Sequence, residues 1–193
     1  MFDIILVLLL APVLIPVILV VTVMLLVLQG RPVFFRQLRV GKNFKTFEIY
    51  KFRSMHNINK NDNLSFDVGN KSRVTWLGKI LRKTKLDELP QIFNVVGGEM
   101  SFVGPRPEVP EWVDLFHDEW TPILSIKPGI TDPASIEFRN EEDLLANADN
   151  PREYYQQVVL PKKLSLYREY LEKKSLFYDL SILFKTMKKV IFS

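Results

Sequence analysis

The sequence has no cysteine and only two histidines, His56 and His117, among its 193 residues. Disulfide bonds and thiolate metal sites are therefore excluded, and two scattered histidines are too few for a zinc cluster. Any metal site must use oxygen ligands, which Mg²⁺ and Mn²⁺ prefer. The absence of cysteine also fits a catalytic part in the cytosol, where disulfide bonds are rare.

Charged side chains are missing from residues 4 to 28, where Pro12, Pro16 and Thr22 are the only interruptions of an apolar run. A straight helix of this length would exceed the roughly 30 Å hydrocarbon core of a bilayer, so it could span one. Each proline removes a helical hydrogen bond and favours a bend. Two arrangements remain: a single span with its N-terminus outside, or a re-entrant helix that breaks at Pro12 and Pro16, dips into one leaflet and returns. We favour the second.

Basic residues are missing before the apolar run, where Asp3 is the only charged residue. A secretory signal peptide is therefore not expected, since it would need a basic start and a small-residue cleavage site. Arg31, Arg36 and Arg39 follow the run and place its C-terminal side in the cytoplasm. We predict a membrane segment over residues 1–30 and one cytosolic, membrane-associated catalytic domain over residues 31–193.

The rest of the chain predicts an α/β (α+β) fold that is mainly helical with a small β-hairpin. The expected strands cover residues 33–35, 44–55 and 100–103, and the hairpin turns at Gly41. The expected helices cover residues 76–83, 87–96, 111–120, 151–173 and 175–192. Residues 57–70 are rich in Asn, Asp and Lys and are expected to form a loop.

The last predicted helix is amphipathic. Leu180, Phe184 and Met187 share one face, while Lys185 and Lys188 lie off it. This pattern fits an interfacial helix on an anionic membrane, and it fits equally a helix that packs on the domain and exposes a basic face to solvent.

The strongest chemical signal is a pair of adjacent carboxylates, Asp87 and Glu88. Pro90 is best tolerated in the first turn of a helix, so the pair is expected at a helix N-terminus, where free N–H groups and partial positive charge favour anions. The plain alternative is a pair of ordinary N-terminal acids, with Thr84 as the helix cap. The basic residues nearby favour phosphate chemistry.

Arginine matches phosphate oxygens with two parallel hydrogen bonds, and Arg82 and Arg106 flank the carboxylate pair. Arg106 stands between Pro105 and Pro107, in a turn stiff enough to hold a charge in place. Lys51 and Arg53, from the hairpin, are further candidates for substrate phosphate or for lipid headgroups. Asp87 could bind one hard divalent cation, and a carboxylate can also attack phosphorus.

Taken together and in this order, the motifs resemble the bacterial sugar transferase family, the small monotopic phosphoglycosyl transferases. The resemblance covers nearly the whole chain. The residues that carry it are Phe2-Asp3, Pro16, Gln29-Gly30-Arg31-Pro32-Val33-Phe34-Phe35, Tyr50-Lys51-Phe52-Arg53-Ser54-Met55, Leu86-Asp87-Glu88-Leu89-Pro90-Gln91, Asn94-Val95, Gly98-Glu99-Met100-Ser101-Phe102-Val103-Gly104-Pro105-Arg106-Pro107 and Lys127-Pro128-Gly129-Ile130-Thr131.

The resemblance implies an enzyme on the cytoplasmic face of the bacterial inner membrane, anchored by a re-entrant helix that breaks at Pro16. Its reaction would move a sugar 1-phosphate from a UDP-sugar to undecaprenyl phosphate, with Mg²⁺ as cofactor and UMP released. Asp87 would be the nucleophile that forms a phosphosugar-aspartyl intermediate, Glu88 would assist it, and Arg82 and Arg106 would hold phosphate oxygens. Other partners considered are membrane lipids, a second copy of the chain and downstream glycosyltransferases.

Three departures from the family pattern stand out. Ile15 replaces a serine that many relatives have before the helix-breaking proline, and no basic residues precede Phe2-Asp3. Residues 132–135, Asp-Pro-Ala-Ser, replace a Gly-Trp-Ala-Gln-like pattern, which indicates a subgroup with its own nucleotide or sugar preference.

Two other functions were weighed. A non-catalytic scaffold could bind anionic lipid through the basic residues 31–85 and recruit enzymes of glycan assembly. A membrane-tethered nucleic-acid-binding protein is the other, but the net charge of +4 is modest and the hairpin aromatics fit a core better, so no nucleic-acid partner is expected.

Overall fold

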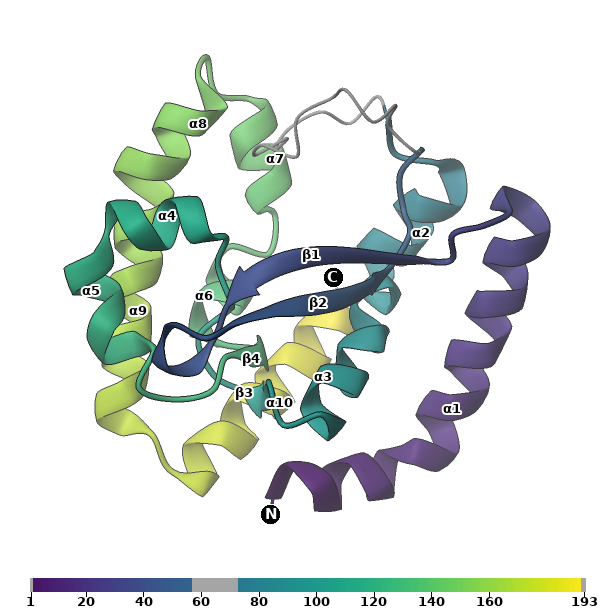
Figure 1. The fold of residues 1–193 in the computed structure, drawn as a ribbon, viewed down its shortest axis with the longest axis horizontal. Coiled ribbons are helices and arrows are strands. Elements are labelled where there is room, and N and C mark those ends of the chain that lie inside the picture. The colour runs from purple at the N-terminus through teal and green to yellow at the C-terminus, as the bar shows by residue number, and fades with distance from the viewer. Residues whose placement is uncertain (1, 57–72, 192–193) are drawn as a thin grey trace.

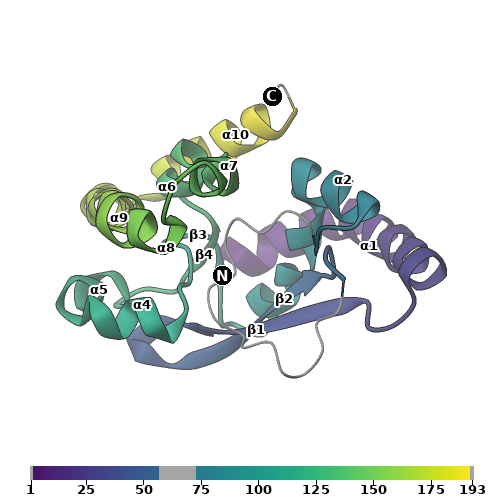
Figure 2. The same ribbon diagram turned by 90° about the horizontal axis from the view of Figure 1, so that it is seen from above.

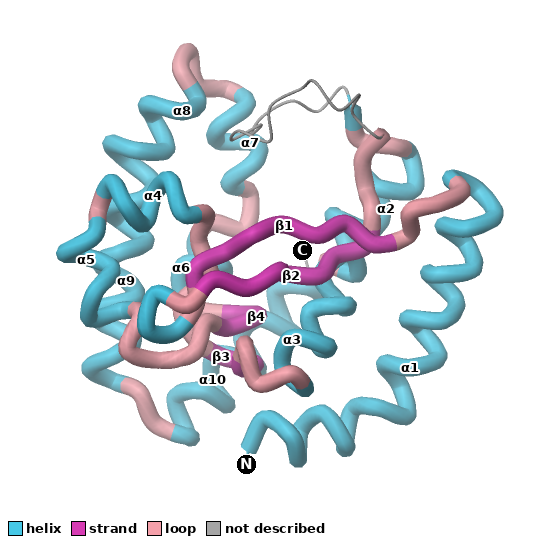
Figure 3. Tube along the Cα trace, viewed as in Figure 1, coloured by secondary structure: helices cyan, strands magenta, loops and turns pink. Residues whose placement is uncertain are grey.

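The computed structural model describes residues 2–56 and 73–191, and the loop predicted over residues 57–70 lies outside them. Helices dominate, with two small two-stranded sheets among them (Figure 1, Figure 3). The elements are α1 (Phe2–Gln29), β1 (Phe34–Val40), η1 (Lys42–Phe44), β2 (Thr46–Phe52), α2 (Trp76–Thr84), η3 (Leu86–Gln91), α3 (Ile92–Val96), β3 (Ser101–Val103), α4 (Pro110–Leu115), α5 (His117–Ile123), β4 (Gly129–Thr131), α6 (Pro133–Glu137), α7 (Glu141–Ala146), α8 (Pro151–Tyr154), η4 (Tyr155–Val159), α9 (Leu160–Lys173) and α10 (Leu176–Ile191). The predicted mainly helical fold with a small hairpin is confirmed.

Helix α1 is continuous from Phe2 to Gln29, with Pro12 and Pro16 inside it. Figure 1 shows that the helix bends between its N-terminal part and the rest, as prolines favour, and the re-entrant break at these prolines stays a prediction. Only Val21 and Leu25 of α1 are buried. Among the described residues it is the one helix long and apolar enough to cross a membrane. So much exposed apolar surface is typical of a segment that contacts lipid.

Both ends of α1 are hydrogen-bonded to the rest of the chain. At its start, Asp3 Oδ1 accepts hydrogen bonds from Ser101 Oγ at 2.7 Å and from the Phe102 amide at 3.0 Å. At its end, Gln29 Nε2 donates to Thr75 Oγ1 at 3.0 Å. Leu25, fully buried, packs in one cluster with residues of β2 and α2. The first and last turns of the long apolar helix are thus held by the same body.

Strands β1 and β2 form an antiparallel hairpin whose register pairs Phe34 with Phe52 and Val40 with Thr46. The turn is a 3₁₀ turn, η1, in which Asn43 and Phe44 have positive φ. Successive side chains of a strand point to opposite faces, so Phe47, Ile49 and Lys51 share one face of β2. Phe47 and Ile49 are buried there against Ile92 and other residues of α3 and β3.

Strands β3 and β4 pair in parallel, with Ser101 opposite Gly129 and Val103 opposite Thr131. Directly after β3, Gly104 touches the main chain at the start of β4. A Cβ on Gly129 would lie 2.1 Å from the Gly104 nitrogen, and one on Gly104 would lie 2.6 Å from the Lys127 oxygen. Only glycine allows two backbones to approach so closely. This contact fixes the start of the turn that carries Arg106.

The helices α4 to α9 pack around a core of large aromatic residues that includes Trp112, Trp120, Tyr155 and Tyr167. Figure 2 shows these helices gathered on one side of the sheets, with α1 and α2 on the other. The single helix predicted over residues 111–120 is instead two helices, interrupted at Phe116, where φ is −122° and ψ is 40°. The predicted helix over residues 151–173 is continuous but contains a π-helical turn, η4.

Helix α10 presents an apolar stripe to its surroundings. Phe177, Leu180, Phe184 and Met187 are exposed at helical spacing, whereas Ile182 is buried. Figure 2 shows α10 and α2 on the side of the molecule opposite the hairpin. Trp76 and Ile80 of α2 are exposed as well. A helix that packed on the domain by its apolar face would bury this stripe, so the exposure favours the interfacial interpretation.

The contact between the two glycines generates a stability prediction. We expect Gly129→Ala to lower the free energy of unfolding by about 2–3 kcal/mol, because its Cβ would overlap main-chain atoms that cannot move aside cheaply. Gly97→Ala is the control, since φ at Gly97 is −67° and a Cβ there meets nothing closer than 3.3 Å. Denaturant unfolding of both variants in detergent tests this, and equal stability of the two would contradict it.

Candidate active site

The carboxylate pair lies in the first turn of the 3₁₀ helix η3, not of an α-helix from residue 87 to 96 as predicted. Pro90 has no N–H, and in an α-helix its ring would clash with the carbonyl four residues earlier, which accounts for the tighter turn. Lys85, with φ of 58°, separates η3 from α2. Thr84 does not cap η3, because its hydroxyl donates to the Ile80 and Leu81 carbonyls of α2.

Glu88 is held between two cations. Its Oε1 accepts from Lys51 Nζ at 2.8 Å, and its two oxygens accept from the two terminal nitrogens of Arg106. Burial raises the pKa of Glu88, but the Arg106 guanidinium and the Lys51 ammonium outweigh burial and bring it well below its usual value. Glu88 is therefore ionised over the whole physiological pH range.

Asp87 lies beside this ion cluster but is not paired in it. The residue is 7% exposed, and its Oδ1 is buried with no hydrogen-bond partner among the residues that the structure describes. Burial, and next the negative charge of Glu88, raise the pKa of Asp87 to about 6, against the pull of Lys51, Lys85 and Arg82. The two neighbouring carboxyls thus have pKa values driven apart, as in sites where one group is fixed and the other reacts.

Lys51 reaches the carboxylates because it lies on the same face of β2 as Phe47 and Ile49. Its side chain is 20% exposed. Burial lowers the pKa of the Lys51 ammonium, while Glu88 opposes the shift. A lysine with two N–H groups left after bonding Glu88 can donate to a further anion.

Arg106 lies in the turn between β3 and α4. Gly129 N donates to Pro105 O at 3.0 Å, which attaches this turn to the start of β4. Asp132 follows β4 and is fully buried. Its negative charge also raises the pKa of Arg106, by less than the charge of Glu88 does. Burial raises the pKa of Asp132, whose oxygens accept from the amide and hydroxyl of Ser135.

The other two predicted phosphate ligands are engaged elsewhere. Arg82 donates to Ser54 Oγ and to Glu142, both at 3.1 Å, and acts on Asp87 only through its charge. Arg53 is buried, and its guanidinium donates to the main-chain oxygens of Gln29, Gly30 and Arg31. The structure thus brings Asp87, Glu88, Lys51 and Arg106 together, and gives Arg53 to the end of α1.

Three buried polar residues of this region were given no role in the sequence analysis. Asp132 and Asn94 are fully buried and hydrogen-bonded. Gln91, also fully buried, has no hydrogen-bond partner for either amide atom within residues 2–56 and 73–191. The sequence carries no signal for two of them, because Gln91 and Asn94 lie off the apolar stripe of Leu89, Ile92 and Val96, where helical periodicity would place them in solvent. Polar side chains are buried at a cost, so these two need a structural or functional reason.

The residues fit one Mg²⁺ ion at most. Among the described residues there is no group of three or more His, Asp or Glu side chains placed to hold a metal. The unpaired Asp87 Oδ1 is a suitable single ligand, whereas Glu88 is occupied by two cations. Mg²⁺ commonly takes one or two carboxylates and completes its shell with substrate phosphates and water.

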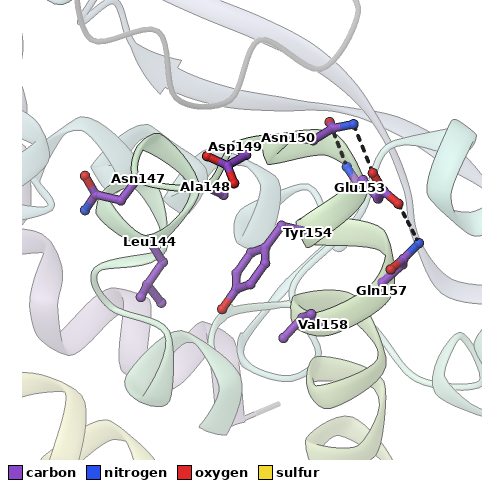
Figure 4. Close-up of a pocket in the computed structure, with 9 residues that line it drawn as sticks. All are labelled: Leu144, Asn147, Ala148, Asp149, Asn150, Glu153, Tyr154, Gln157 and Val158. Carbon is purple, nitrogen blue, oxygen red and sulfur yellow. Dashed lines mark hydrogen bonds between the residues drawn. The ribbon is translucent and has the colours of Figure 1, made fainter.

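A hollow of about 480 Å³ lies between α7 and α8, away from the carboxylate pair. Figure 4 shows Asp149, Glu153 and Tyr154 around it, together with apolar Leu144 and Val158. Its lining includes two acids and no lysine or arginine. This charge disfavours a phosphate, so the hollow is not the phosphate site.

Comparison with known proteins agrees with the geometry. The sequence model of the bacterial sugar transferase family matches residues 1–193. The chain belongs to this family. The resemblance noted from the motifs is thereby confirmed, and with it the prediction of a transferase at the level of the family.

Three relatives illustrate the proteins to which this chain is similar. EpsL of Bacillus subtilis (strain 168), an uncharacterized sugar transferase, is 36% identical over 164 residues, which cover 85% of this chain and 72% of EpsL. The UDP-N-acetylgalactosamine-undecaprenyl-phosphate N-acetylgalactosaminephosphotransferase of Aeromonas hydrophila is 36% identical over 180 residues, covering 91% of this chain and 39% of that protein. The UDP-glucose:undecaprenyl-phosphate glucose-1-phosphate transferase of Klebsiella pneumoniae is 36% identical over 183 residues, covering 90% and 36%. The chain therefore spans little more than a third of the two relatives named for a reaction.

The shifted pKa of Asp87 predicts a pH-dependent gain in stability on its removal. Its pKa is about 6 in the folded chain and 3.8 without burial, so the folded state is favoured fully below pH 3.8 and loses this advantage as pH rises through 6. We expect Asp87→Asn to raise the free energy of unfolding at pH 7 by up to about 3 kcal/mol. The gain should shrink between pH 6 and pH 4.

Thermal unfolding in detergent, followed by circular dichroism at several pH values, measures this. Asp114→Asn is the matched control, because Asp114 is exposed. A loss of stability for Asp87→Asn at pH 7, or the same gain at every pH, would contradict the prediction.

Proposed function

We propose that this bacterial sugar transferase moves a sugar 1-phosphate from a UDP-sugar to undecaprenyl phosphate and releases UMP. The observation that carries the proposal is the split carboxylate pair, in which Glu88 is fixed between Lys51 and Arg106 while Asp87 stays unpaired. The names of the relatives from Aeromonas and Klebsiella support the donor and acceptor classes. The product would begin a lipid-linked glycan of a capsule, exopolysaccharide, O-antigen or glycoprotein.

In the first step, an oxygen of ionised Asp87 attacks the phosphorus that bears the sugar. A bond forms between this oxygen and phosphorus, and the bond from phosphorus to the bridging oxygen breaks, so that UMP leaves with the electron pair. In the second step, a phosphate oxygen of undecaprenyl phosphate attacks the same phosphorus and restores the Asp87 carboxylate. Poor solvation of Asp87, which raises its pKa, also makes the carboxylate a better nucleophile.

Arg106 and Lys51 hold the phosphate oxygens in both steps. Each has N–H groups beyond those that bond Glu88, and Glu88 keeps the two cations in place before substrate arrives. Arg82 adds positive charge from a greater distance, and Arg53 is not part of this phosphate site. Mg²⁺, with Asp87 Oδ1 as a ligand, would supply further neutralisation of the diphosphate charge.

The proposed chemistry requires Asp87 at a membrane surface, because one substrate is soluble and the other is a lipid. We infer that α1 is re-entrant and that the catalytic part lies on the cytoplasmic face of the inner membrane. At about 1.5 Å per residue, a spanning α1 would separate its ends by roughly 40 Å. The hydrogen bonds that Asp3 accepts and Gln29 donates join both ends of α1 to the same body and support a return to one side. The exposed stripe of α10 would set the depth of the site.

The alternative of a non-catalytic scaffold remains, with a homodimer or downstream glycosyltransferases as partners. It differs from the enzyme in one respect, because a scaffold does not need the Asp87 carboxylate. The buried, unpaired oxygen of Asp87 favours the enzyme, since such a group costs stability and a scaffold would have no use for it.

Transfer is tested with purified protein in detergent, Mg²⁺, undecaprenyl phosphate and a panel of UDP-sugars. We expect the wild-type chain to release UMP from at least one donor. Release by Asp87→Asn should be at least about 1,000-fold slower because the nucleophile is lost, a loss of the size that removal of a nucleophile typically causes. Asp114→Asn, the exposed control, should keep full activity. Equal UMP release by wild type and Asp87→Asn would contradict the enzyme, and transfer without a covalent phosphosugar on Asp87 would contradict the intermediate.

The re-entrant helix is tested with a single cysteine, which the natural sequence permits because it has none. We expect Phe2→Cys in intact cells to react with a membrane-impermeant maleimide only after the membrane is opened. Glu172→Cys, at the end of α9, is the reference for the cytoplasmic side. Labelling of Phe2→Cys in intact cells would place the N-terminus outside and overturn the re-entrant arrangement.

A further inference from the structure

Asn94 is a fully buried amide in α3 with every polar side-chain atom bonded. Its Oδ1 accepts from the Tyr50 amide at 3.1 Å. Its Nδ2 donates to the Glu48 carbonyl and to Glu99 Oε2, both at 2.7 Å. The side chain therefore joins α3 to the main chain of β2.

Two of these bonds reproduce the pairing of a β-strand. The Glu48 carbonyl and the Tyr50 N–H point to the same edge of β2, the edge not paired with β1. A neighbouring strand would offer one C=O and one N–H to them, and the Asn94 amide offers the same two groups. Aspartate has the same shape but no donor, and leucine has neither group, so asparagine is the side chain that suits this position.

The other side of Asn94 is fixed to the segment of the carboxylate pair. Its main-chain oxygen accepts from the Glu99 and Met100 amides, which close the end of α3. Helix α3 continues η3 without a gap, so Asn94 lies six residues after Glu88 in one helical unit. Asn94 thus binds β2 at Tyr50, immediately before Lys51, and belongs to the unit that carries Glu88.

The apolar contacts of β2 do not by themselves fix the position of the strand along α3. Phe47 and Ile49 pack against Ile92 and Val95, and such contacts tolerate small sliding of a strand along a helix. Hydrogen bonds are directional and fix the register to a fraction of an ångström. Lys51 must meet Glu88 at 2.8 Å, so a slide of this size would separate the ammonium from the carboxylate.

We propose that Asn94 is a positioning residue, which sets Lys51 against Glu88 by pairing with the main chain of β2 as a strand would. Asn94 does not touch the reacting atoms and acts through Lys51. Its effect on transfer rests on the proposed function, whereas its effect on the Lys51 side chain does not. The plain alternative is that Asn94 only stabilises the fold.

The substrate-free arm of the test measures Lys51 itself. An amine-reactive N-hydroxysuccinimide ester labels lysines, and mass spectrometry gives the rate at Lys51 in the detergent-solubilised full chain. We expect Asn94→Ala to change the Lys51 rate by at least about fivefold, as Glu88→Gln should, since both loosen the ion pair. Val159→Ala is the matched control, because it truncates a buried core residue that has no link to β2. An unchanged Lys51 rate in folded Asn94→Ala would overturn the proposal.

The catalytic arm is a double-mutant cycle. Displacement of a binding group by about 1 Å can cost up to 100-fold in rate, so we expect Asn94→Ala to lower kcat/KM by about 10- to 100-fold. In a Lys51→Met background, Asn94→Ala should cost less than about twofold more, because the group it positions is gone. Val159→Ala should cost the same in both backgrounds.

The outcomes separate the two proposals. Multiplied losses for Asn94→Ala and Lys51→Met, or a loss in Asn94→Ala no larger than in an equally destabilised Val159→Ala, would mean that Asn94 only stabilises the fold. A wild-type chain that transfers nothing from any donor would overturn the proposed function. In that case the labelling rate of Lys51 still decides whether Asn94 positions it.

Discussion

The site depends on one constraint, which is that Glu88 satisfies two cations at once. Lys51 comes from the hairpin and Arg106 from the turn after β3, two segments that also meet at a β-bridge between Val40 and Glu108. Like charges would repel at this distance without the carboxylate between them. The 3₁₀ turn that Pro90 imposes places Glu88 at that point, and it leaves Asp87 beside the cluster with an unpaired oxygen. Glu88 therefore holds the site together, while the adjacent Asp87 has the oxygen that is suited to react.

Two close contacts with main-chain atoms hold the segments of Arg106 and Lys51 in place. The Gly104 and Gly129 contact fixes the arginine turn, and the Asn94 amide fixes the strand of Lys51. Both are contacts to backbone atoms, which cannot change rotamer. A site made of long, flexible lysine and arginine side chains thus gains precision from groups that have little freedom of their own.

Much of this could be predicted from the sequence, for identifiable reasons. Period-2 and period-3.6 patterns predicted the hairpin, α2 and the C-terminal helices, and the Asp87-Glu88 motif predicted the dyad at a helix start. The 3₁₀ form of η3 was missed, because proline permits several local solutions and tertiary contacts choose among them. The role of Arg53 at the end of α1 was not predicted, because it depends on hydrogen bonds to three main-chain carbonyls that no pattern of side chains reveals. Asn94 was missed as a working residue because it bonds the main chain of β2, far away in the sequence, and Asp132 because its charge acts on Arg106 from another segment.

The hydrogen bonds of Asp3 have a mechanical consequence. They attach the first turn of α1 to Ser101 and Phe102, the opening residues of β3, and β3 leads in three residues to the glycine before Arg106. Because β3 is only three residues long and pairs with β4, a displacement of the first turn of α1 would move the arginine turn with it. The start of the apolar helix and the charge cluster are thus joined by one short connection.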